Sequence, residues 1–190
     1  MESFNPEARI AVLGRMVSKA PNRSLGRTQV MKLFYFLQEL KGVPLGYDFR
    51  LFNYGPFDSE VLSDLSSGCG LEAVHEEVVI HANGYGYAIT PGQQAGLLEK
   101  ELDAMGSTLK SIVDQVVLEF GKSSASELEL LSTILYVDRE FAAADVPAGD
   151  KEITDRVQKI KPHFSTTVIR QGVLNMAAKG HLKNVPSHSV

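Results

Sequence analysis

Apolar residues recur at helical spacing along most of the chain and alternate with polar residues in only two short stretches. The strongest helical pattern lies between residues 28 and 41, where the apolar seam is formed by Val30, Leu33, Leu37 and Leu40. This segment is apolar nearly all round, so we expect it at the centre of the core. Thr28 can cap its start, and Gly42 can end it.

Further helices are predicted on both sides of this segment. Asn5-Pro6-Glu7 is a favourable helix start, because Asn caps well and Pro fits the first helical position. Asp58 or Ser59 can cap a helix that stops near residues 66–68. After Thr90 and Pro91, which can start the next helix, only helices are expected. They cover residues 92–104, 107–120, 125–140, 150–160 and 165–179.

Two stretches favour strands instead of helices. Residues 47–54 are aromatic and alternate, which predicts a short strand that Gly55-Pro56 breaks. Residues 71–89 predict a β-hairpin, with Asn83-Gly84 as the turn and alternating aromatic residues on the returning strand.

The order helix, helix, short strand, helix, hairpin, helix is that of a winged helix. The hairpin would be the wing, and the helix near 58–67 would take the place of the recognition helix. We therefore predict a mainly α fold with a small β component, in the α+β class. It would comprise a winged-helix-like domain over residues 1–105 and a helical part over residues 106–190, packed as one compact unit. The alternative is a helical bundle that carries a hairpin.

Two motifs in residues 27–67 carry a resemblance to a known group of proteins. The helix has the form K-L-x-Y-x-x-Q-x-x-x-G, formed by Lys32, Leu33, Tyr35, Gln38 and Gly42, and the later turn is Tyr54-Gly55-Pro56. This arrangement resembles the bacterial Panacea-type antitoxin domains and the uncharacterised proteins similar to the SocA proteolysis adaptor. The helix predicted at 125–140 looks like the later helical part of these relatives. The aromatic run Phe34-Tyr35-Phe36 departs from the more aliphatic residues usual there.

This resemblance implies a function without catalysis. It implies a small bacterial protein, often linked to phages or plasmids, that acts by binding a toxin-like or regulatory partner protein.

Composition supports an ordinary globular protein in the cytoplasm. The chain has 190 residues and a formal net charge of −4, so it is not the basic protein that binding DNA over its whole surface would require. Its single cysteine, Cys69, excludes an intrachain disulfide and suits a reducing compartment. The first residues lack the basic region of a signal peptide, and no apolar run is long enough to span a membrane.

The distribution of charge argues against DNA reading by the predicted helix and wing. No Lys or Arg occurs from Leu51 to Glu99, whereas this span contains seven carboxylates. Phosphates would repel such a surface. Aromatic and acidic residues instead suit contact with a partner protein. The candidate partner-binding residues are Tyr54, Phe57, Asp58, Glu60 and Asp64.

The C-terminal part has the opposite charge, because no acidic residue follows Asp155. The candidate nucleic-acid-binding residues there are Arg156, Lys159, Lys161, Arg170 and Lys179. They could belong to a transcriptional regulator that holds DNA with these helices. An ordinary solvated surface is the favoured interpretation, and contact with the acidic face of a second copy in a homo-oligomer is a third.

Signatures of catalysis are weak. Cys69 lies between two glycines in acidic surroundings, which do not activate a thiol. His75, Glu77 and His81 share one face of the predicted strand, but no second cluster closes a metal site around them. We find no motif for a nucleotide, metal or other cofactor, and we expect no enzyme and no cofactor. A hydrolase or metal enzyme is the least supported reading.

Overall fold

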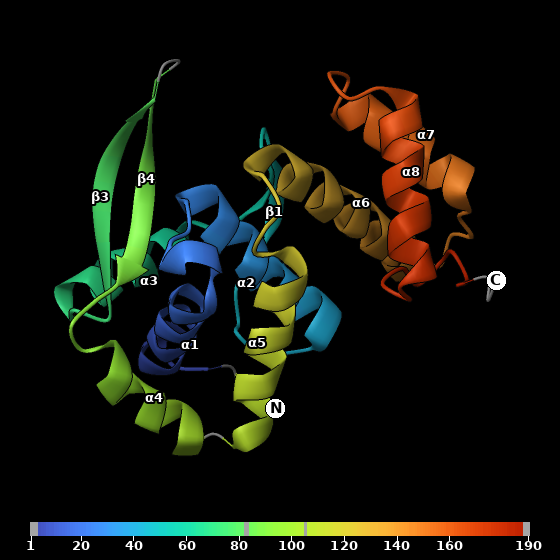
Figure 1. Ribbon diagram of the computed structural model, residues 1–190. Helices are drawn as coiled ribbons and strands as arrows, with labels where there is room; N and C mark the ends of the chain where they lie inside the picture. Colours follow the sequence, from blue (N-terminus) through green and yellow to red (C-terminus); the bar gives the residue numbers. More distant parts are fainter. Residues whose placement is uncertain (1–3, 82–83, 105, 188–190) are drawn as a thin grey trace. The chain divides into compact units, whose positions relative to one another are not determined.

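The computed structural model describes residues 4–81, 84–104 and 106–187, without the side chains of His81, Leu97, Glu99, Ala104 and Ser107. It is mainly helical with two small antiparallel sheets, which confirms the predicted α+β class. The chain divides into two compact units (Figure 1). The first comprises Met1–Phe49 and Phe57–Ala125, and the second comprises Arg50–Pro56 and Ser126–Val190.

The first unit is built around two buried helices, α1 (Pro6–Lys19) and α2 (Arg27–Lys41). Every residue of α2 from Val30 to Leu37 is buried, which confirms the predicted core helix. Asn5 caps α1 as predicted, because its Oδ1 accepts a hydrogen bond from the Ala8 amide at 2.9 Å. Gly42 ends α2 at a φ of 66°, a left-handed conformation that favours glycine.

The predicted cap of α2 at Thr28 is wrong. The helix begins one residue earlier, at Arg27, and Gly26 is its N-cap. The Gln29 side chain accepts a hydrogen bond from the Gly26 amide at 2.7 Å. A side chain in the first turn thus satisfies the amide at the helix entrance, which leaves Thr28 inside the helix.

Three further helices and a hairpin complete the first unit. The helices are α3 (Ser59–Gly70), α4 (Ala95–Ala104) and α5 (Ser107–Phe120), and a short 3-10 turn covers Pro21–Arg23. α5 packs on α1 and α2, and its Phe120 ring stacks on Phe36 with centroids 4.3 Å apart. The boundary predicted after residue 105 therefore falls inside the first unit. The expectation of one compact body stays a prediction.

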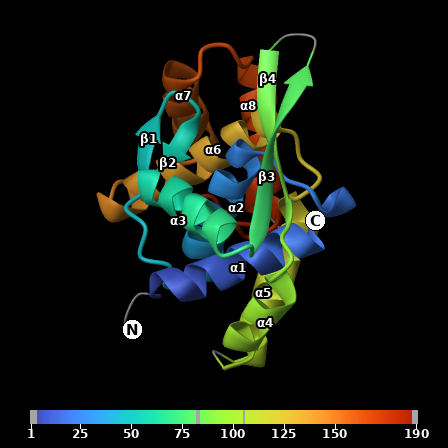
Figure 2. The same cartoon turned by 90° about the vertical axis from the view of Figure 1, so that its left-hand side faces the viewer.

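The hairpin consists of β3 (Val74–His81) and β4 (Gly84–Pro91), as predicted. Its antiparallel register runs without a shift from Val74 opposite Pro91 to His81 opposite Gly84. Asn83 of the predicted turn lies outside the described residues. Figures 1 and 2 show the hairpin projecting beyond the helices of its unit. Near its base, Leu25 pairs with Ile89 of β4 through two backbone hydrogen bonds of 3.0 and 2.8 Å.

Thr90 and Pro91 do not start the next helix, which corrects that prediction. Both residues end β4, and α4 begins only at Ala95. The backbone between β4 and α4 is held beside the start of β3, because the Gly92 amide donates a hydrogen bond to the Ala73 carbonyl at 3.0 Å. This tertiary pairing outweighs the local preference of Thr-Pro for a helix start.

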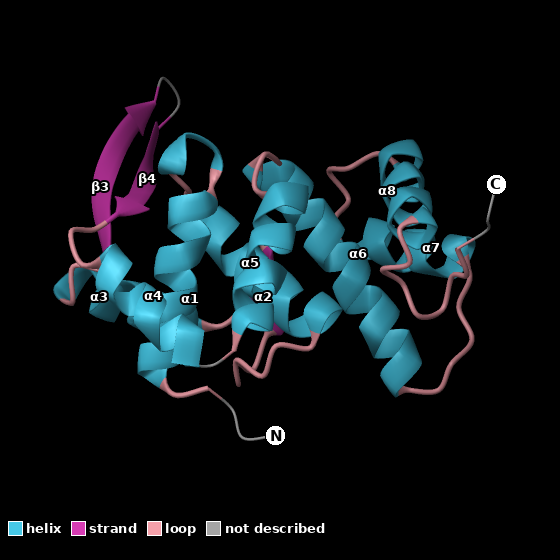
Figure 3. Ribbon diagram, turned by 60° about the horizontal axis from the view of Figure 1, so that its bottom comes forward, coloured by secondary structure: helices cyan, strands magenta, loops and turns pink. Residues whose placement is uncertain are grey.

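The second unit contains α6 (Ala125–Ala143) except its first residue, α7 (Asp150–Ile160), α8 (Thr166–Ala178) and most of a small hairpin. The hairpin strands are β1 (Arg50–Phe52) and β2 (Gly55–Phe57), so Gly55-Pro56 starts a strand instead of only breaking one. Gly55 has a φ of +86°, and a Cβ there would lie 3.1 Å from Ser132 Oγ of α6. Close packing on α6 therefore requires a glycine at this corner. Figure 3 distinguishes the helices from the short strands.

Candidate functional site

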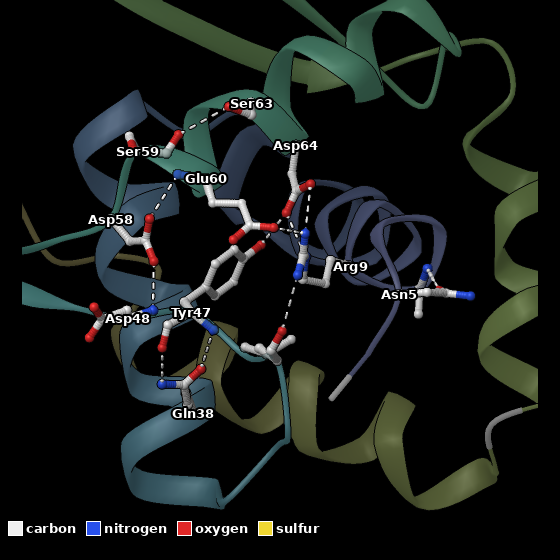
Figure 4. Close-up of polar contacts among 12 residues, drawn as sticks. Asn5, Arg9, Gln38, Tyr47, Asp48, Asp58, Ser59, Glu60, Ser63 and Asp64 are labelled. Atoms are coloured by element: carbon white, nitrogen blue, oxygen red, sulfur yellow. Dashed lines mark hydrogen bonds and ion pairs between the residues drawn. The ribbon is translucent and has the colours of Figure 1, made fainter. Parts of the chain in front are cut away.

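The predicted acidic surface is largely engaged in contacts within the first unit. Asp58 caps α3, where its Oδ1 accepts from the Glu60 amide at 2.8 Å. Its Oδ2 accepts a hydrogen bond from the Asp48 amide at 2.6 Å, so Asp58 also holds the segment before the small hairpin (Figure 4). Asp58 therefore positions the start of α3 and the segment before the small hairpin through two exposed hydrogen bonds.

Asp64 is buried, which contradicts its predicted role in partner binding. Its carboxylate accepts from Arg9 Nε at 2.7 Å and from the Tyr47 hydroxyl at 2.7 Å (Figure 4). Glu60 adds a second carboxylate 2.5 Å from the Arg9 guanidinium. Burial and the bond to Asp64 raise the pKa of Tyr47, so this phenol stays protonated as the donor of the network. The network ties α1 to α3 and is structural.

The aromatic residues of the same prediction are divided between the two units. Tyr54 is 73% exposed and lies in the second unit, next to exposed Phe52. Phe57 is half-buried and belongs to the first unit, like Asp58, Glu60 and Asp64. The five predicted residues are therefore not brought together on one surface of one unit.

The projecting hairpin carries an apolar surface that the sequence analysis missed. Val78, Ile80 and Tyr85 are 62%, 86% and 71% exposed. Ile80 stands directly opposite Tyr85, and Val78 stands opposite Tyr87, so all four side chains lie on one face of the two-stranded sheet. We call Val78, Ile80 and Tyr85 the wing face. The sequence signal for this face is alternation: Val78 and Ile80 are two residues apart on one strand, and Tyr85 and Tyr87 are two residues apart on the other.

An ion pair between Arg27 and Glu76 lies at the base of this face. Arg27 binds Glu76 with two hydrogen bonds of 2.7 and 2.5 Å, and its guanidinium lies 3.5 Å from the centroid of the Tyr87 ring. The bond and charge of Glu76 raise the pKa of Arg27, which remains charged. Because Glu76 is neutralised by Arg27, the wing face above it is apolar without a competing charge.

A hollow of about 400 Å³ lies at the foot of the hairpin, lined by Cys69, Glu72, His75, Thr90 and neighbouring residues. Burial and the Glu76 carboxylate raise the pKa of the Cys69 thiol, the opposite of what activates a nucleophile. Within the described residues, no group of three His, Cys, Asp or Glu is placed to hold a metal ion. The metal site considered from the sequence also included His81, whose side chain is not described.

The predicted nucleic-acid-binding residues differ in their surroundings. Lys161 is buried, which contradicts its predicted role: its Nζ lies 2.7 Å from Glu129 Oε1 and donates to the Asn53 carbonyl. Arg170 is paired with Asp150 at 3.0 Å, and Arg156 lies 3.9 Å from Glu140. Lys159 and Lys179 are exposed. The basic residues thus form no continuous cationic surface of five side chains.

Comparisons with known proteins assign no family. No protein-family model matches the chain, and no curated protein matches it at a significant level. No helix among the described residues combines the length and the apolar character needed to cross a membrane.

Proposed function

We propose that this protein is a non-enzymatic interaction module that binds a partner protein through the wing face. The observation that carries the proposal is the exposure of Val78, Ile80 and Tyr85 on one side of a projecting hairpin. Three neighbouring large apolar side chains cost free energy in water, and a contiguous exposed patch of this kind marks interaction sites. Tyr85 adds the type of aromatic residue that often dominates binding energy.

The scaffold that presents this face is, in our proposal, a winged helix. The order α1, Leu25, α2, α3, β3, β4 supports this assignment. Leu25 stands between the first two helices and pairs with the second wing strand, as the short first strand of a winged helix does. In this scheme α3 is in the position of the recognition helix, and the β1–β2 hairpin is an insertion before it.

Charge supports a protein rather than DNA as the partner of this unit. The span Leu51–Glu99 has no Lys or Arg, and Arg27 at the wing base is already paired with Glu76. Phosphates would find no cation on α3 or on the wing. An antitoxin-like or adaptor-like role within this class rests on the resemblance of Lys32–Gly42 and Tyr54–Pro56 alone.

DNA binding by the C-terminal helices is the less supported alternative. Of its five candidate residues, Lys161 is buried in an ion pair, and Arg156 and Arg170 have acidic neighbours in their own unit. Each phosphate contact would have to compete with these carboxylates. No observation in the second unit favours nucleic acid over an ordinary solvated helix surface.

The proposal predicts that Ile80→Asp weakens capture of the partner by about 10- to 30-fold, because a charge at the centre of an apolar contact must be desolvated. The measurement is pull-down from cells of the native host, followed by titration with the purified partner. Leu118→Asp is the matched control. Leu118 is also a large apolar residue of the first unit, 80% exposed, but lies on α5.

Leu118→Asp should leave the affinity within about twofold. Equal affinity of Ile80→Asp and the unmodified protein for the captured partner would exclude the wing face as the binding surface. A circular dichroism spectrum equal to that of the unmodified protein confirms that each variant is folded.

A further inference from the structure

We propose that the outer edge of β3, which faces away from β4, accepts an extended segment of the partner as an added strand. The segment would alternate apolar and basic residues. This inference rests on the proposed function and specifies how the wing recognises its partner. It follows from the direction of the backbone groups, the lack of protection of this edge and the charges beside it.

The register of the hairpin fixes which backbone groups point outward. Ile89 uses both its amide and its carbonyl on Leu25, so these groups point away from β3. The facing pair Glu76–Ile89 is therefore a pair without mutual hydrogen bonds. Because the direction alternates along a strand, the amides and carbonyls of Glu76, Val78 and Ile80 face outward, and those of Glu77 and Val79 bond to β4.

Only the upper part of this edge is open. At the base, the Glu76 backbone hydrogen-bonds Cys69 of α3. Among the described residues, no hydrogen bond reaches the outward groups of Val78 and Ile80. Figures 1 and 3 show no other described segment of the first unit beside the upper part of β3 on that side. Two amides and two carbonyls are thus available for a short added strand.

This edge lacks the usual protections against strand pairing. Natural edge strands carry Pro or charged residues, contain a bulge, or are covered by another segment. The open part of the edge, residues 78–80, contains neither Pro nor a charged residue, and the register with β4 has no shift that would indicate a bulge. An unprotected edge beside an exposed apolar face is the combination that β-strand addition uses.

The side chains next to the edge select the chemistry of the added strand. On one face, its side chains would meet Val78 and Ile80 of the wing face, which favours apolar residues. On the other face they would meet the half-buried Val79 and the exposed Glu77, so a Lys or Arg is favoured beside Glu77. A second copy of this chain fits less well, because residues 74–81 contain no Lys or Arg to meet Glu77.

The test uses two synthetic eight-residue peptides, one that alternates valine with lysine and one that alternates valine with glutamate. Each is titrated into the ¹⁵N-labelled protein, and amide shifts are followed by NMR up to millimolar peptide. We expect saturable shifts at Val78 and Ile80 with the lysine peptide and weaker binding of the glutamate peptide. Absence of shifts at these two amides would overturn the inference.

Two variants separate the backbone and the charge contributions. Val78→Pro removes an outward amide without removing a hydrogen bond to β4. It should lower the affinity for the lysine peptide by about fivefold or more. Glu77→Lys should reverse the preference between the peptides, with changes of about two- to fivefold in each dissociation constant. Glu101→Lys is the control, because it makes an equal charge change at an exposed position of α4. It should alter the dissociation constant of neither peptide.

Two further outcomes would overturn this inference while leaving the proposed function in place. One is a partner that loses affinity with Ile80→Asp but not with Val78→Pro, which would show recognition of the face without strand addition. The other is a concentration-dependent dimer, seen by light scattering, that protects the Val78 and Ile80 amides without peptide. Equal affinity of Ile80→Asp would instead refute the proposed function itself.

Discussion

Replacing Asp64 by alanine is expected to lower the free energy of unfolding of the first unit by about 3–5 kcal/mol. The side chains of Asp64 and Arg9 are 5% and 6% exposed, and removal of the carboxylate would leave the buried guanidinium without its buried counter-charge. Tyr47 would also lose the acceptor of its hydroxyl. Urea unfolding followed by circular dichroism measures the change. Hydrogen exchange on peptides from α1 and α3 assigns it to this unit.

Glu60→Gln is the matched control for this experiment. Its carboxylate contacts the same arginine but is 49% exposed, and ion pairs in contact with water contribute little. We expect a loss below about 1 kcal/mol. Losses of equal size for the two variants would show that burial of Asp64 does not determine the energetics of the network.

Lys161→Met should destabilise the second unit by about 3–5 kcal/mol. The lysine and Glu129 side chains are 2% and 10% exposed, with 2.7 Å between the charged atoms, so methionine would leave a buried carboxylate without its counter-charge. The bond from Lys161 to the Asn53 carbonyl would also be lost. Hydrogen exchange in residues 50–56 should therefore increase together with exchange in α6 and α7.

The exposed Lys159 provides the control, because it lies in the last turn of α7, two residues before Lys161. Lys159→Met should change the stability by less than about 0.5 kcal/mol. Combining Lys161→Met with Glu129→Leu should recover much of the loss, since an apolar pair replaces a buried ion pair at little cost. A double variant as unstable as Lys161→Met alone would contradict this account.

Local patterns were sufficient for the helices whose burial follows their own periodicity. The bounds of α5 and α7 match the predicted 107–120 and 150–160, and the core helix α2 was identified from its apolar seam. The strands β3 and β4 followed from alternation and a turn signal. In these segments the local preference and the tertiary environment favour the same conformation.

The candidate sites were less predictable, because charged residues are usually exposed, whereas Asp64 and Lys161 are buried. Asp64 lies on the buried face of α3 with Val61, Leu65 and Gly68, at helical spacing. Lys161 is the buried C-cap of α7 and follows the buried Val157 by four residues. Reading charged residues within the periodic pattern would have identified both as partners of buried groups.

The small β1–β2 hairpin could not be predicted from local sequence. Its two strands have three residues each, and Gly55 is held against Ser132 and Thr133 of α6, more than 70 residues away in the chain. Such a contact determines a strand through packing that no local pattern contains. For the same reason the division of the predicted aromatic and acidic surface between two units could not be foreseen.

The central claim is that the wing face contacts a partner protein, and site-specific photocrosslinking in the native host tests it most directly. A photoreactive phenylalanine analogue replaces Ile80 in one variant and Leu118 in another, and crosslinked proteins are identified by mass spectrometry. The account predicts one dominant crosslinked protein at position 80, the one that pull-down captures, and none enriched at position 118. Crosslinking of that protein from position 118 but not from position 80 would contradict it.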